Sequence, residues 1–181
     1  YANAKKDYLK AISLDPYDAE LHIAMGSTKL HLNEFESAIA SFDTAIIIHP
    51  DNSNAYINRG IAKRHLERLD DAVEDLNKAV YYDIFNIEAL VRRGILQMEL
   101  EQYQDALFDF NNALTLDNDN PIIFFNRGTV YLNIGDTISA LKDYERVNNL
   151  DERNALTYFN RAIIYAQLEE NDIALALFNK V

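Results

Sequence analysis

Small and apolar residues recur along this chain at a fixed interval of 34 residues. The triplet Asn58-Arg59-Gly60 returns in related form three times, and a glycine stands one interval before it. The recurring sites are Gly26, Asn58-Arg59-Gly60, Arg92-Arg93-Gly94, Asn126-Arg127-Gly128 and Asn160-Arg161-Ala162. A regular interval of this length is typical of an array of similar structural units.

Apolar residues at helical spacing predict two helices in each interval. The first helices are predicted over residues 19–32, 53–66, 87–100, 121–134 and 155–168. The second helices are predicted over 35–48, 69–82, 103–116, 137–150 and 171–181, and a single helix over 1–14 precedes them. An Asp or Asn stands directly before each first helix, where its side chain can accept a hydrogen bond from a free backbone N–H. These capping residues are Asp18, Asn52, Asn86, Asn120 and Asn154.

Small residues predict where the two helices of a pair touch. The glycines of the first helices are unfavourable for a helix unless a neighbouring helix comes close. An alanine follows twelve residues later in every interval, at Ala38, Ala72, Ala106, Ala140 and Ala174. A larger side chain comes four residues after each alanine, at Phe42, Leu76, Phe110, Tyr144 and Phe178. We therefore expect tightly crossing helix pairs with these larger side chains in the core.

The interval, the small residue, the alanine and the larger residue after it resemble the tetratricopeptide repeat (TPR). This resemblance implies an all-α, right-handed superhelical solenoid of helix-turn-helix repeats whose first helices line an inner groove. We expect one array over residues 1–181, within a longer protein because the sequence begins at Tyr1 and not at methionine. The predicted parts are a half repeat over 1–18, repeats over 19–52, 53–86, 87–120 and 121–154, and an incomplete repeat over 155–181.

Composition excludes several classes of function. A net charge of -12 disfavours a nucleic-acid partner, which would require clustered Lys and Arg, and favours a protein or peptide with net positive charge. The chain has no cysteine, and the equivalent residues His31 and His65 are too few for a metal site. No apolar run is long enough to cross a bilayer, and no catalytic motif is present. We predict no metal, no cofactor, no membrane insertion and no enzymatic activity.

The candidate binding residues lie around the small residue of the first helices. Because a carboxamide both donates and accepts, a row of Asn on one face can bind the backbone of an extended peptide, and Arg92 can contact an anion. Flanking apolar residues can anchor apolar side chains of a partner. The predicted groove residues are Asn58, Arg92, Asn126, Asn160, Ile57, Ile61, Val91, Ile95, Phe125 and Phe159. The alternative is structural: the Asn bond within the helices and the apolar residues are buried against neighbouring repeats.

A second row consists of Arg59, Arg93, Arg127 and Arg161. We interpret it as exposed ion pairs with acidic residues of adjacent helices, each worth about 0–1 kcal/mol.

The resulting prediction is a non-catalytic scaffold or adaptor that binds a peptide or partner protein in its groove. Two alternatives stay open: a regulatory or substrate-recruiting arm of an enzyme, and self-assembly through the ends of the array. The cytoplasm is favoured, and a periplasmic or secreted location stays open because the true N-terminus is not shown.

Overall fold

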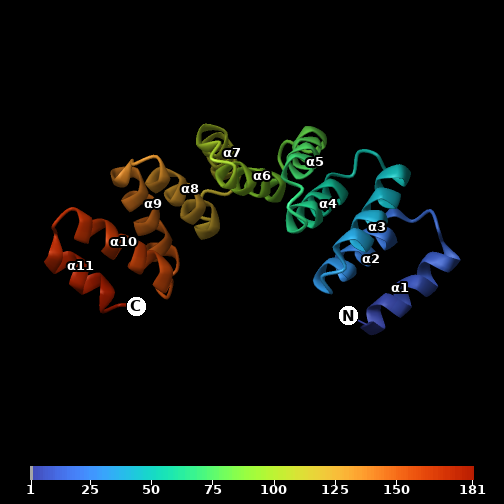
Figure 1. Ribbon diagram of the computed structural model, residues 1–181, viewed down its shortest axis with the longest axis horizontal. Helices are drawn as coiled ribbons and strands as arrows, with labels where there is room; N and C mark the ends of the chain where they lie inside the picture. The colour runs from blue at the N-terminus through green and yellow to red at the C-terminus, as the bar shows by residue number, and fades with distance from the viewer. Residues whose placement is uncertain (1) are drawn as a thin grey trace. The chain divides into compact units, whose positions relative to one another are not determined.

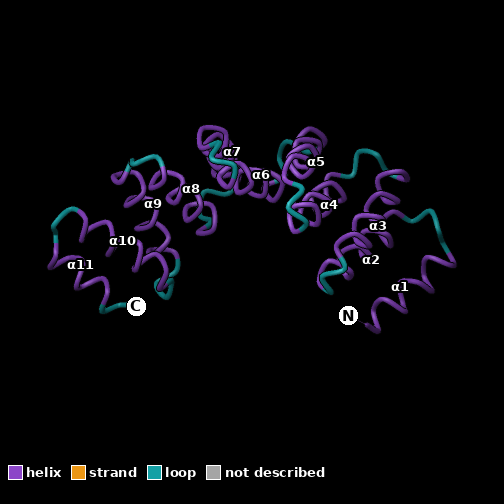
Figure 2. The backbone as a smooth tube through the Cα atoms, in the orientation of Figure 1, coloured by secondary structure: helices purple, strands orange, loops and turns teal. Residues whose placement is uncertain are grey.

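The protein is built from helices throughout the part of the chain that the structure describes. This structure is a computed structural model that describes the backbone of residues 2–181 and the side chains of residues 5–181 (Figure 1). Within these residues it contains eleven helices and no strand, and short loops join the helices (Figure 2). The all-α helix-turn-helix fold is therefore confirmed.

Helix bounds follow the predicted intervals closely. The lone helix is α1 (Ala2–Leu14). The first helices are α2 (Ala19–His31), α4 (Ser53–His65), α6 (Ile87–Glu99), α8 (Pro121–Asn133) and α10 (Ala155–Gln167). The second helices are α3 (Phe35–Ile48), α5 (Leu69–Tyr82), α7 (Tyr103–Leu116), α9 (Thr137–Leu150) and α11 (Asn171–Phe178). The chain forms two compact units, one up to Leu96 and one from Gln97 onwards, and it passes from one to the other within α6.

All five predicted caps form. The side chain of Asp18 accepts hydrogen bonds from the backbone N–H groups of Glu20 and Leu21, and the Asn caps accept equivalent bonds. Each first helix ends one residue earlier than predicted, because the chain then turns through a residue with positive φ. These turn residues are Asn33, Glu67, Glu101, Gly135 and Glu169.

Close contact at the small residues is also confirmed. An added Cβ at Gly26 would lie 2.4 Å from a ring carbon of Phe42, and one at Gly128 would lie 3.0 Å from the ring of Tyr144. The five alanines of the second helices are buried. Phe42, Phe110 and Tyr144 have no exposed surface. The helix pairs therefore cross at points that have no room for a larger side chain.

Three arginines of the row, Arg59, Arg127 and Arg161, pair with acidic residues of adjacent helices as predicted, but their side chains are largely buried, so the expected exposure of these pairs was wrong. The side chain of Arg59 is 14% exposed and that of Asp75 is 1% exposed. Nε and Nη2 of Arg59 donate to Asp75 on α5, and Nη1 donates to Asp43 on α3. Arg127 of the second unit repeats this arrangement with Asp143 on α9 and Asn111 on α7. One arginine thus joins the second helices of two consecutive repeats.

These arginines keep their charge although they are largely buried. Burial lowers the pKa of Arg59, but hydrogen bonds to Asp75 and Asp43 outweigh it and raise the pKa above its ordinary value. For Arg127, the hydrogen bond to Asp143 raises the pKa more than burial lowers it. The guanidinium groups are therefore permanent cations, and the carboxylates beside them are part of the packing.

The last arginine of the row keeps an acidic neighbour on the preceding second helix, with Nη2 3.8 Å from Oε1 of Glu145, but it lacks the aspartate on the second helix of its own repeat. Sixteen residues after Arg59 and Arg127 stand Asp75 and Asp143, but the equivalent position after Arg161 is Leu177. Arg161 binds Asn148 through Nη1, and its buried Nε has no hydrogen-bond acceptor in the described residues. The apolar substitution therefore explains this unsatisfied donor.

Removal of Asp75 tests the strength of the buried network. Asp75 also pairs with Lys63 at 2.7 Å, so Asp75→Ala leaves two largely buried cations without this carboxylate. We expect the free energy of unfolding to fall by about 3–5 kcal/mol in urea titrations. The matched control is Glu74→Ala, whose exposed carboxylate pairs with Lys78 and should matter by about 0.5 kcal/mol or less. Equal losses in the two variants would contradict the account.

Contact at Gly26 can be tested by a double-mutant cycle. Alanine favours the helix by about 1 kcal/mol over glycine, but overpacking against Phe42 costs about 1–3 kcal/mol. We therefore expect Gly26→Ala to destabilise the native chain and to do so less in a Phe42→Leu background. Thermal unfolding of the four proteins measures the coupling between the two positions, and a coupling of zero would argue against the close contact.

Candidate functional site

Two of the candidate asparagines, Asn58 and Asn126, form hydrogen bonds within their own helices. In α4 and α8, the two residues after the Asn are the Arg and Gly that contact the second helices. Nδ2 of Asn58 donates to the carbonyl of Asn54 at 2.9 Å, and Nδ2 of Asn126 donates to the carbonyl of Ile122 at 2.7 Å. Within the described residues, the Oδ1 atoms of Asn58 and Asn126 accept no hydrogen bond. The oxygen atoms of these two carboxamides are therefore available as hydrogen-bond acceptors.

Asn160 has a structural role that Asn58 and Asn126 lack. Burial raises the pKa of the Tyr144 hydroxyl, while hydrogen bonds to Thr129 and Asn160 act in the opposite direction. The hydroxyl groups of Thr129 and Tyr144 are 3.1 Å apart. The Asn160 side chain thus lies beside the hydroxyl of a core residue, which is the kind of environment that the structural alternative describes.

Arg92 lies on the exposed side of α6. Its guanidinium pairs with Glu88 one turn earlier at 3.2 Å, and both side chains are exposed to solvent. An exposed pair of this kind contributes little to stability, so a partner carboxylate can compete with Glu88 for the guanidinium. Its contact with a partner anion stays a prediction.

The predicted apolar residues divide into buried and accessible ones. Ile57 is only 1% exposed, so its assignment to a partner-binding surface was wrong: it belongs to the core of the first unit. Ile61, Val91 and Ile95 are half-buried in the same unit. In the second unit, Phe125 is half-buried with its ring 5.8 Å from that of Tyr144. Phe159 is 43% exposed and contacts the ring of Phe178.

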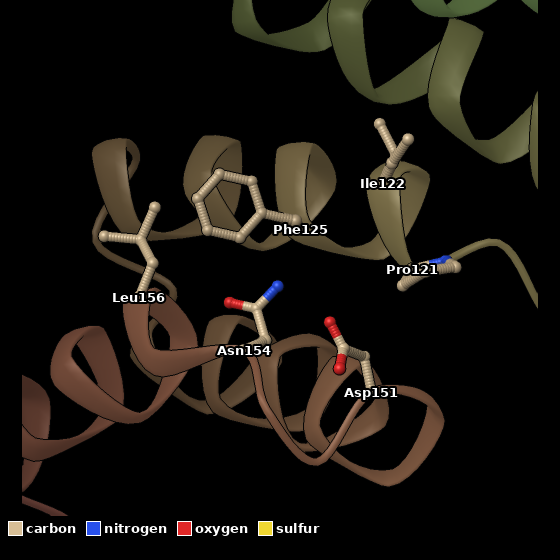
Figure 3. A pocket seen from close by; sticks show the side chains of 6 residues that line it. All are labelled: Pro121, Ile122, Phe125, Asp151, Asn154 and Leu156. Atoms are coloured by element: carbon tan, nitrogen blue, oxygen red, sulfur yellow. The ribbon is translucent and has the colours of Figure 1, made fainter. Parts of the chain in front are cut away.

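A pocket of about 240 Å³ lies between the N-terminal halves of α8 and α10. Figure 3 shows the ring of Phe125 on α8 near Leu156 at the start of α10, Ile122 at the other end of the pocket on α8, and Asn154 and Asp151 on the turn before α10. The pocket is lined by Pro121, Ile122, Phe125, Asp151, Asn154 and Leu156. Ile122 lies four residues before Asn126, and Leu156 lies four residues before Asn160. Each apolar wall of the pocket is therefore one helical turn from an asparagine on the same helix. The second unit therefore combines an apolar pocket with carboxamides on one face.

Most of this pocket was missing from the predicted groove, which included Phe125 alone of its six residues. The signal was present at one repeat position. That position holds Glu20, Asn54 and Glu88 in the earlier repeats and changes to Ile122 and Leu156 in the last two. A polar position that becomes apolar and stays exposed is a functional signal. Asp151 and Asn154 carried no such signal, because their equivalents serve turns and caps in every repeat.

Family models match most of the chain. A model described as tetratricopeptide repeat matches residues 23–86, and another of the same description matches residues 1–18 and 122–154. A third model, described as TPR repeat, matches residues 94–135.

The chain belongs to the tetratricopeptide repeat family. No curated protein matches this chain.

Solved TPR structures share this fold. YrrB, described as a TPR protein with an unusual peptide-binding site, is 26% identical with a TM-score of 0.78, over 96% of this chain and 89% of YrrB. MamA from Desulfovibrio magneticus RS-1 is 16% identical with a TM-score of 0.82, over 90% and 92% of the two chains. PilF from Pseudomonas aeruginosa is 21% identical with a TM-score of 0.83, over 90% and 74%. The last two likenesses show the fold alone.

The described part of this TPR chain lacks two features of other site classes. None of its helices has the length and apolar character needed to cross a bilayer. Its His, Asp and Glu side chains form no group of three or more that could hold a metal ion. The pocket between α8 and α10 is the candidate site of the second unit.

The different roles of the two asparagines in the second unit can be measured. Asn160→Ala removes the polar side chain beside the buried Tyr144 hydroxyl, so we expect a loss of about 0.5–1.5 kcal/mol in the free energy of unfolding. Asn126→Ala removes a bond within its own helix and adds a better helix former, so its effect should lie within about 0.5 kcal/mol of zero. Urea titrations of both variants test this, and the reverse order of stability would exclude a structural role specific to Asn160.

Proposed function

We propose that this TPR chain is a non-catalytic protein-interaction scaffold. In this proposal, the face of α8 and α10 in the second unit binds an extended segment of a partner protein. The TPR family is typically a non-catalytic interaction module, and this supports the general class of function. YrrB, which is 26% identical, is described as having a peptide-binding site, and this favours a peptide as the form of the ligand.

The observation that carries the proposal is the pairing of an apolar pocket with an accessible carboxamide oxygen. An extended segment exposes backbone N–H groups and alternating side chains. Oδ1 of Asn126 can accept from one such N–H, while the pocket lined by Ile122, Phe125 and Leu156 receives a side chain. The backbone contact provides affinity for any extended sequence, and the pocket selects among sequences.

The charge of the chain favours a basic partner. The formal net charge is -12, and long-range attraction of this kind raises association rates more than final affinity. In the first unit, Asn58 presents the same free acceptor as Asn126. Ile61, Val91 and Ile95 lie half-buried there, and Arg92 is exposed. We propose these residues as a second contact surface, in the first unit.

Selection from a random peptide library tests the proposal directly. We expect the immobilised protein to enrich peptides that bind reversibly, and Asn126→Ala to weaken the best of them by roughly three- to tenfold, the loss of about one hydrogen bond. The matched control is Asn149→Ala, since Asn149 is an exposed asparagine on the second helix α9. Enrichment of no peptide, or equal weakening by the two variants, would contradict the proposal.

A further inference from the structure

The pocket between α8 and α10 contains two apolar side chains whose exposure the fold does not require. Ile122 is 61% exposed and Leu156 is 55% exposed, and each lies on the first turn of its helix. Equivalent positions in three earlier repeats are polar, so packing of the repeat does not require an apolar residue there. Exposed apolar groups that line a concave site indicate a ligand with an apolar part.

The size of the pocket limits what can enter it. Its volume of about 240 Å³ is below the range of roughly 300–1,000 Å³ that is typical of sites for whole small molecules. The half-buried ring of Phe125 lies between Ile122 and Leu156 and is held in place by its contact with Tyr144. This space suits one branched aliphatic or aromatic side chain.

Asp151 is the charged residue among those that line the pocket. Its Oδ1 accepts the backbone N–H of Arg153 at 3.1 Å, and Oδ2 accepts no hydrogen bond within the described residues. Figure 3 shows the carboxylate of Asp151 and the carboxamide of Asn154 directed toward the space between α8 and α10. Arg127 and Arg146 are already bonded to Asp143 and Asp119. A cation of the ligand can therefore occupy the free side of Asp151.

We infer that this pocket binds one apolar side chain of a partner segment and that Asp151 pairs with a Lys or Arg next to that side chain. This inference rests on the proposed function and specifies the ligand class of the same site. An acidic segment would be repelled by Asp151 and by the net charge of the chain. The same repulsion disfavours a second copy of this chain as the occupant.

The test uses NMR of the whole protein with labelled Ile and Leu methyl groups and labelled Asn side-chain amides. The probe is the capped tetrapeptide Gly-Leu-Lys-Gly, compared with peptides that carry Ser in place of Leu or Glu in place of Lys. We expect Gly-Leu-Lys-Gly to shift the methyl signals of Ile122 and Leu156. We also expect it to bind roughly two- to fivefold more tightly than the Glu peptide, as for an exposed ion pair.

Two variants locate the charge preference. Asp151→Asn keeps an oxygen for the N–H of Arg153 but removes the charge, so the preference for Lys over Glu should disappear. Glu152→Gln removes a charge from the neighbouring exposed residue, which does not line the pocket, and should preserve most of the preference. A preference that survives in Asp151→Asn, or equal binding of the Leu and Ser peptides, would overturn the inference.

The same spectra separate this inference from the proposed function. Shifts of the Asn126 side-chain amide without shifts of the Ile122 and Leu156 methyls would leave a peptide-binding face intact and overturn the role of the pocket. Absence of shifts at both places would overturn both statements. Shifts at both places, with the preference for Lys, support both.

Discussion

The buried bonds between arginine and aspartate are the interaction on which the packing of consecutive repeats depends. Arg59 of the first helix α4 binds Asp75 on α5 and Asp43 on α3, so one side chain joins three helices. Burying a guanidinium is unfavourable unless it is paired and hydrogen-bonded, and the two carboxylates satisfy that requirement. Arg127 repeats this arrangement in the second unit with Asp143 and Asn111.

This network fixes which face of a first helix remains available for a partner. Arg59 and Gly60 follow Asn58 directly, and both are committed to contacts with the second helices. The preceding Asn is consequently left at the surface with a free Oδ1. In the second unit the same geometry places Asn126 on the surface, and the change from polar to apolar at Ile122 and Leu156 adds a pocket one turn away. Within the same short triplet, the last two residues thus serve packing and the first is left at the surface.

Much of the fold could be predicted because its causes are local. Helix caps such as Asp18 and the small residues opposite Phe42 depend on positions within one repeat, and these positions recur in phase. The exposure of Arg59 was misjudged because it binds both Asp75 of its own repeat and Asp43 of the preceding repeat, which the spacing of a single helix does not reveal. The same spacing did not show that Ile57 is buried. The pocket depends on two first helices and on the turn that carries Asp151, so only part of it could be predicted.

The central claim is that the face formed by α8 and α10 binds an extended, basic and partly apolar segment. Intermolecular NOEs between the protein and a peptide selected from a library test this claim most directly. We expect NOEs from the methyl groups of Ile122 and Leu156 to the peptide's apolar side chain, and from the Asn126 amide to its backbone. NOEs that instead connect the peptide to the exposed Ile138 on α9 would contradict the account.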